Sequence, residues 1–173
     1  MIVVADTSPI NYLLLIEQID LLPYLFQKIV IPDVVHNEMR DPGAPLLVQK
    51  WIASPPDWFK VKAVSVMDRN LNSLDPGEQA AITLAQALPA DLLIIDERLG
   101  REAAKNLGVP IIGTLGILDD AANQGLIDLS ETLHVINLHR SCCLISHADR
   151  DSFSVLDWCV EQNFSCPSSV IVA

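Results

Sequence analysis

Cysteine is absent from the first 141 residues of this 173-residue chain. The four cysteines all lie in its last fifth, at Cys142, Cys143, Cys159 and Cys166. A disulfide framework is therefore excluded for the leading region, and free thiols are the simplest state for the four. His139 and His147 lie nearby, which leaves a zinc site as an alternative, although the spacings match no standard zinc finger.

Basic residues are also scarce. The chain has 11 Lys and Arg against 22 Asp and Glu, giving a net charge of −11. This balance disfavours binding to nucleic acid through a broad basic surface. Two interpretations stay open: the protein avoids nucleic acid, or its carboxylates gather in a site that cations neutralise.

The chain has no long apolar run. Half of its residues are hydrophobic and the mean hydropathy is +0.33, yet no run reaches the roughly 18 apolar residues of a membrane span. The N-terminus has no basic segment, and Asp6 and Asn11 interrupt its apolar residues, which disfavours a signal peptide. We therefore expect a cytoplasmic protein with no membrane partner.

Short apolar runs alternate with helical patterns along most of the chain. The predicted strands are Ile2–Ala5, Ile29–Ile31, an edge strand at Phe59–Val66, Leu92–Ile95 and Val109–Ile112. The predicted helices are Asn11–Ile16, Asp20–Gln27, Asp33–Arg40, Pro45–Ala53, Pro76–Leu88, Leu99–Leu107 and Thr114–Gly125, with a loop at Met67–Ser73. This alternation predicts an α/β domain with a mostly parallel sheet and helices on both sides.

Composition changes near Leu133. All seven glycines and all five lysines precede that residue, whereas seven of the twelve serines lie from Ser141 onward. We therefore expect a domain over residues 1–133 and an atypical C-terminal tail over residues 134–173, whose structure the sequence does not predict.

Two predicted strands end in an aspartate, Asp6 and Asp96. The carboxyl ends of parallel strands form the crevice in which sites are built, so the two side chains are expected to face each other. Two like charges about 4 Å apart repel by about 4 kcal/mol at an effective dielectric constant near 20, which favours a bound cation or a proton. Each aspartate has an alternative role as a helix cap.

Two glutamates are further candidates. Glu38 lies four residues after Val34 on an apolar stripe, although an exposed helix position is the alternative. Glu78 fits position N3 of a capping box led by Asp75, and a first-turn carboxylate can also point into the crevice. A set of oxygen donors without His or Cys suits Mg²⁺ or Mn²⁺.

Five stretches occur together in the order of a known family. They are VADTSPI at Val4 to Ile10, IPDVVHNEM at Ile31 to Met39, LDPGEQAAITLA at Leu74 to Ala85, LLIIDERLGREAA at Leu92 to Ala104 and VPIIGTLGIL at Val109 to Leu118. With them the chain resembles the PIN-domain family over roughly residues 2–130. It is most similar to the subgroup with LDxGE and GTxGxL motifs, related to the toxin halves of bacterial toxin–antitoxin pairs.

The resemblance implies a three-layer α/β/α fold and a metal-dependent ribonuclease. Its catalytic and metal-binding acids would be Asp6, Glu38, Glu78 and Asp96, with Mg²⁺ or Mn²⁺ as cofactor and RNA as substrate. Thr7 or Ser8 would be the neighbouring hydroxyl. The family often has Asp-Asp where this chain has Asp96-Glu97, so a role for Glu97 is left open. An antitoxin protein is the implied partner.

Substrate contacts are expected on one helix. Arg98 and Arg101 lie three residues apart after Asp96 and are candidates to contact the phosphate backbone, although an ion pair with Glu102 is an equal alternative. Arg40 and Lys105 are weaker candidates. Thr114 is expected either to orient a metal-bound water or to cap its helix.

Other functions stay open. A non-enzymatic PIN-like module would dock a protein partner, and the apolar excess would fit a partner groove or a homodimer face. Phosphatase chemistry of the haloacid-dehalogenase kind needs a second aspartate where Ser8 stands. Histidine-based RNA cleavage is disfavoured, because three of the four histidines lie in or beside the tail.

Overall fold

The centre of the fold is a parallel five-stranded sheet. A computed structural model describes residues 1–133, and within them the strand order is β3-β2-β1-β4-β5. The strands are β1 (Val3–Ala5), β2 (Ile29–Pro32), β3 (Phe59–Lys62), β4 (Leu92–Ile94) and β5 (Ile111–Ile112). Each of the four strand pairings is parallel, which confirms the predicted α/β class.

Strand β1 lies in the middle because it is apolar on both faces. Val3, Val4 and Ala5 are completely buried. Val3 and Ala5 pack into one hydrophobic cluster and Val4 into the other, as the alternation of side chains along a strand requires. Strand β1 therefore lies in the core of the domain.

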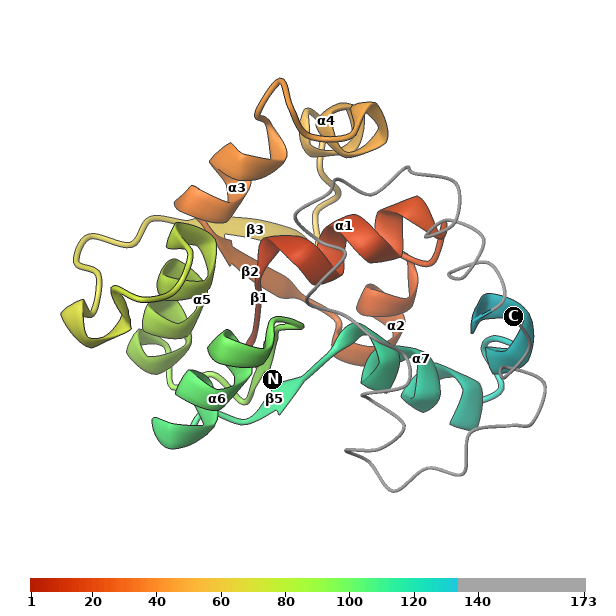
Figure 1. Ribbon diagram of the computed structural model, residues 1–173. Coiled ribbons are helices and arrows are strands. Elements are labelled where there is room, and N and C mark those ends of the chain that lie inside the picture. The colour runs from red at the N-terminus through yellow and green to blue at the C-terminus, as the bar shows by residue number, and fades with distance from the viewer. Residues whose placement is uncertain (134–173) are drawn as a thin grey trace, which may run out of the picture.

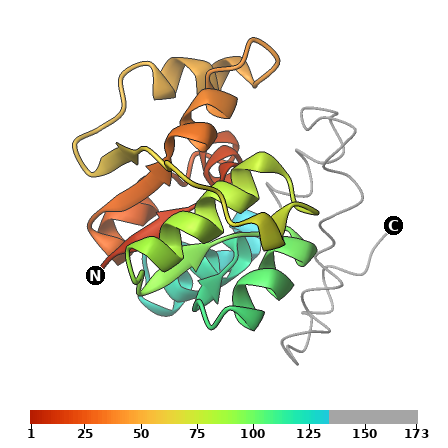
Figure 2. The same cartoon turned by 90° about the vertical axis from the view of Figure 1, so that its left-hand side faces the viewer.

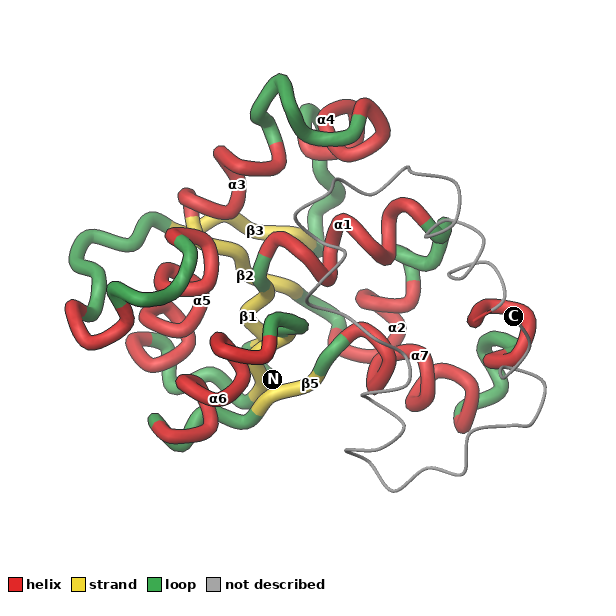
Figure 3. The backbone as a smooth tube through the Cα atoms, in the orientation of Figure 1, coloured by secondary structure: helices red, strands yellow, loops and turns green. Residues whose placement is uncertain are grey.

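Helices cover both faces of the sheet, which gives the expected three layers (Figures 1 and 2). One layer contains α5 (Pro76–Ala87) and α6 (Arg98–Asn106). The helices that pack into the other cluster are α1 (Thr7–Leu15), α2 (Leu21–Phe26), α3 (Asp33–Met39), α4 (Leu46–Ile52) and α7 (Thr114–Asn123). Figure 3 shows the strands between these two groups of helices.

Two predicted features are wrong in detail. The edge strand β3 ends at Lys62 rather than Val66, and the expected loop that follows contains a 3₁₀ helix, η1 (Arg69–Leu71). The predicted helix over Leu99–Leu107 is present as α6, and in it Leu99 is 55% exposed and Leu107 is 38% exposed. Gly100 and Ala104 are the residues of α6 that are buried.

Several predictions concern the part of the chain beyond Leu133. The tail, its four cysteines and the zinc alternative lie outside the described residues. Within residues 1–133, no helix has both the length and the hydropathy that a bilayer crossing requires.

Candidate acidic site

Three carboxylates are buried at the carboxyl ends of β1 and β4. Asp6 follows β1 directly, and Asp96 lies two residues after β4. Their residues are 3% and 5% exposed, and Glu78 on α5 is 6% exposed. A buried carboxylate is costly unless a proton, a cation or several hydrogen bonds compensate its charge. The three carboxylates differ in the groups that compensate their charge.

Of the three carboxylates, Asp6 has the fewest groups that compensate its negative charge. It occupies the N-cap position of α1, but its side chain makes no capping hydrogen bond. Burial raises its pKa to about 8, and the negative charges of Glu78, Glu38 and Asp96 add to the increase, while the Thr7 amide opposes it. The predicted capping bond is thus absent. The four acids are close enough for three of them to act on Asp6.

The Asp96 carboxylate accepts two hydrogen bonds from one residue, Thr114. The Thr114 amide donates to Oδ1 at 2.7 Å and its hydroxyl donates to Oδ2 at 2.6 Å. Burial raises the pKa of Asp96, and these two bonds and the positive charge of Arg101 oppose the increase. Glu97 occupies the N-cap position of α6 and Gly113 that of α7, so the alternative capping roles of Asp96 and Thr114 are both wrong.

Glu78 caps the first turn of α5 and also lies beside the other acids. It is N3 of α5, and the Asp75 amide donates to its Oε2 at 3.1 Å, which is the carboxylate half of the predicted capping box. Burial raises the pKa of Glu78, as do the charges of Glu97 and Asp75, while the amides of Asp75 and Gly100 lower it. Its other oxygen, Oε1, is buried and has no hydrogen bond of ordinary geometry. Oε1 is therefore the less compensated of the two oxygens.

Glu38 and Glu97 complete the acidic group through two hydroxyls of α1. The Thr7 hydroxyl donates to Glu38 Oε2, which joins α1 to α3. Glu38 is half-buried, so the alternative of an exposed helix position is wrong. The Ser8 hydroxyl donates to Glu97 Oε1 at 3.5 Å. Glu97, whose role the sequence left open, is thus a fifth acid near Glu78, and its only signal was its position after Asp96.

The two candidate arginines differ. Arg98 Nη1 lies 3.9 Å from Glu102 Oε1, and both side chains are mostly exposed, so the ion-pair alternative describes Arg98. Arg101 is half-buried and lowers the pKa of Asp96, which places its charge beside the acidic group. Arg40 and Lys105, the weaker candidates, are exposed.

The chemistry of these carboxylate oxygens fits a hard divalent cation. Oxygens from four separate segments approach one another, one of them has no hydrogen bond of ordinary geometry, and burial together with the neighbouring acids raises the pKa of Asp6. The groups are not already spaced as a closed site: within residues 1–133, no three His, Cys, Asp or Glu side chains have an arrangement that could hold a metal ion.

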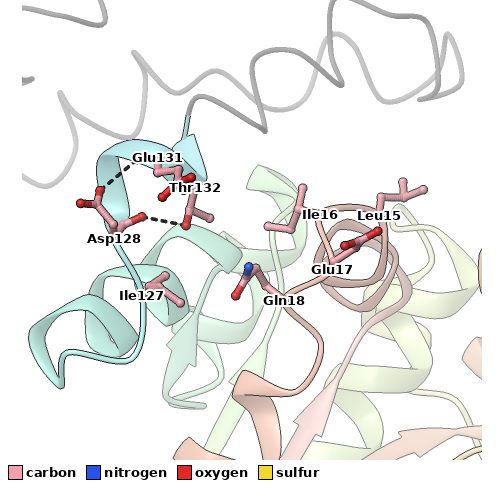
Figure 4. Close-up of a pocket in the computed structure, with 8 residues that line it drawn as sticks. All are labelled: Leu15, Ile16, Glu17, Gln18, Ile127, Asp128, Glu131 and Thr132. Atoms are coloured by element: carbon pink, nitrogen blue, oxygen red, sulfur yellow. Dashed lines mark hydrogen bonds between the residues drawn. The ribbon is translucent and has the colours of Figure 1, made fainter.

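A separate cavity lies away from the acids. It has a volume of about 580 Å³ and is lined by the segment from Leu15, the last residue of α1, to Gln18, and by four residues after α7 (Figure 4). Glu17, Asp128 and Glu131 give its wall an acidic character. None of the four acids at the strand ends lines it.

Comparisons with known proteins agree with the fold. A family model described as a PIN domain matches residues 2–146. A similar solved structure is a PilT N-terminus domain protein, SSO1118, from the hyperthermophilic archaeon Sulfolobus solfataricus P2. It is 22% identical, with a TM-score of 0.53, and the match covers 70% of this chain and 93% of that chain. No curated protein matches the chain significantly.

Proposed function

Because the chain belongs to the PIN-domain family, whose members are generally nucleases, we propose that it is a metal-dependent endoribonuclease. The proposed cofactor is Mg²⁺ or Mn²⁺. The residues that would hold it are Asp6, Glu38, Glu78 and Asp96. The observation that carries this proposal is that Asp6, Asp96 and Glu78 are buried beside one another although they come from distant segments.

A divalent ion bound by these oxygens would supply a water of lowered pKa as the nucleophile and would stabilise the leaving oxygen at phosphorus. The chain's own residues prepare for this chemistry. Thr114 fixes the orientation of Asp96 with two hydrogen bonds, and Thr7 holds Glu38. Asp6 must release its proton to become a ligand, so binding competes with protonation near pH 8.

The remaining polar groups have roles around the phosphate. Arg101 lies beside the acids and is the residue we assign to a backbone phosphate of the RNA. Arg98, which is more exposed, would contact RNA only at the rim. Ser8 acts through Glu97, because its hydroxyl donates to that carboxylate.

We further propose that the protein is the toxin component of a toxin–antitoxin pair acting in the cytoplasm. The LDxGE motif at Leu74 and the GTxGxL motif at Gly113 support this assignment. An antitoxin protein would be its partner, and a homodimer would be the form that binds it. The exposed apolar residues Tyr24, Leu46 and Leu47 offer surface for such contacts.

The test combines Mn²⁺ titration with RNA cleavage. The full chain is expected to bind Mn²⁺ and to cut RNA in Mg²⁺ or Mn²⁺, and both properties should be lost in Asp6→Asn. Asp120→Asn is the matched control, because Asp120 is an exposed residue of α7. Cleavage that survives both Asp6→Asn and chelation would refute the proposal.

A catalytically silent module that docks a protein partner is the second candidate. The observation in its favour is that no three acids within residues 1–133 are already spaced to hold a metal ion. The same titration separates the two candidates. A full chain that binds no Mn²⁺ by calorimetry favours the silent module.

A further inference from the structure

The seven glycines of the chain fall into groups with different reasons for lacking a side chain. Gly108 and Gly125 have φ of +73° and +72°, and a Cβ at either would meet nothing within 4 Å. These two are turn glycines, required by their backbone conformation. They lie at the ends of α6 and α7 and away from the acids.

Gly77 and Gly100 have no such conformational reason. Neither has a positive φ. Gly77 lies in the first turn of α5 and Gly100 in the first turn of α6. A helix is less stable with glycine than with alanine at an ordinary position, so another factor must favour glycine at both.

That factor is space for a carboxylate. A Cβ on Gly77 would lie 2.6 Å from Glu38 Oε2 and 2.9 Å from Glu38 Oε1. A Cβ on Gly100 would overlap Glu78 Oε1 and lie 2.6 Å from Ile95 Cδ1. Real Cβ atoms do not approach oxygen this closely, so alanine at either position would displace the glutamate.

Gly113 has the same relation to the third acid. A Cβ there would lie 2.9 Å from Asp96 Oδ1 and 3.0 Å from Arg101 Nη1. Its φ of −103° is ordinary for any residue. The missing side chain therefore lets the carboxylate and the guanidinium approach the same point.

We propose that these three glycines are positioning residues of the acidic site, each leaving open the space that one site carboxylate occupies. Their catalytic meaning rests on the proposed function. The pairs are Gly77 with Glu38, Gly100 with Glu78 and Gly113 with Asp96. Glu78 shows why space matters: its buried Oε1 lies against Gly100 and has no hydrogen bond of ordinary geometry, so the surface of α6 limits where that oxygen lies.

The pair Gly77 and Glu38 gives the sharpest test, because all three atoms nearest to the added Cβ belong to Glu38. Urea unfolding of the full chain in EDTA is measured for Gly77→Ala, for Glu38→Ala and for the double variant. The change in midpoint caused by Gly77→Ala should be less favourable when Glu38 is present than when it is absent. In the Glu38→Ala background the same substitution should leave the midpoint unchanged or raise it, because the clash is gone and alanine favours the helix.

Mn²⁺ affinity is the readout that a purely structural role would not change. Gly77→Ala should weaken Mn²⁺ binding about tenfold, as expected when the support of a metal ligand is altered. Gly116→Ala is the control: its Cβ would lie 2.7 Å from Ile112 Cγ1, with no carboxylate among its neighbours. It should lower the midpoint and leave the Mn²⁺ affinity as it is.

Two results would overturn the positioning role. One is an equal midpoint change from Gly77→Ala in both backgrounds, and the other is an unchanged Mn²⁺ affinity in Gly77→Ala. Failure of the unsubstituted protein to bind Mn²⁺ would instead refute the proposed function. The midpoints measured in EDTA would then still decide whether the glycine makes room for Glu38.

Discussion

Asp6 and Asp96 are buried to a similar extent, yet their surroundings treat the negative charge differently. Asp96 receives two hydrogen bonds from Thr114 and lies near Arg101, and all of these oppose the effect of burial on its pKa. Asp6 has only the Thr7 amide to oppose burial and three neighbouring acids. Two carboxylates whose environments differ in this way are suited to different protonation states at neutral pH.

Thr114→Val tests whether the hydroxyl prepares Asp96. The substitution keeps the amide bond to Oδ1 and removes the donor to Oδ2, so the pKa of Asp96 should rise further and its carboxylate should lose its fixed orientation. Mn²⁺ affinity and RNA cleavage should each fall about 10- to 100-fold. Calorimetry and a cleavage assay measure the two effects.

Thr132→Val is the matched control for that experiment. Thr132 is also buried, and its hydroxyl donates to the Asp128 carbonyl at 2.8 Å, away from the acids. It should lower the free energy of unfolding by about 1 kcal/mol without changing Mn²⁺ affinity. Equal losses of affinity in the two variants would show that Thr114 acts through stability alone.

For single residues, the sequence predicted where the acidic side chains lie better than it predicted their hydrogen-bond partners. The location of Asp6 and Asp96 at strand ends follows from local patterns, because a strand followed by a helix start is a short-range signal. The bond from Thr114 to Asp96 joins residues 18 apart, and capping was an equally good local use of the same hydroxyl. Only the packing of α7 against the end of β4 decides between them.

Helix α6 shows that the buried face of a helix cannot always be predicted from its apolar periodicity. A spacing of four residues places Leu99, Ala103 and Leu107 on one stripe, which periodicity alone would turn toward the core. The helix instead packs through Gly100 and Ala104, which bring it close to the sheet and to Glu78. Small residues at a close contact outweigh larger apolar ones here, and periodicity alone does not show this.

A stability comparison tests that orientation. Leu99→Gln should change the free energy of unfolding by less than about 0.5 kcal/mol, because the side chain is mostly exposed. Ile82→Val in α5 should cost about 1 kcal/mol, because Ile82 is completely buried. Urea unfolding of both variants gives the two values. A loss of 2 kcal/mol or more in Leu99→Gln would contradict the exposed position.

At the scale of the domain, the sequence predicted that strands and helices alternate, but it did not predict the order of the strands in the sheet. The sheet places β1 between β2 and β4, so Asp6 and Asp96 become neighbours although 90 positions separate them. The same topology gathers negative charge in the interior of a chain whose net charge is already −11. The fold therefore stores unfavourable electrostatic energy at the carboxyl ends of its central strands, and this energy depends on pH.

The metal-free protein should become less stable as pH rises from 5 to 8. The pKa of Asp6 is about 8 in the folded chain against an ordinary value of 3.8, so in this range the folded state binds more protons than the unfolded state. Stability then falls with rising pH, by a total on the order of 2–4 kcal/mol. The raised pKa values of Glu78 and Asp96 act in the same direction.

Urea unfolding in EDTA at several pH values measures this fall, and two comparisons assign it. Asp6→Asn should flatten the dependence, whereas the surface variant Asp120→Asn should keep it. Mn²⁺ should oppose the fall, because it binds the ionised folded state and stabilises it by mass action, so the gain in melting temperature on adding Mn²⁺ should grow from pH 6 to pH 8. A stability that stays constant or rises with pH in EDTA would mean that Asp6 is ionised in the folded chain. The acids would then already be compensated by groups of the protein itself.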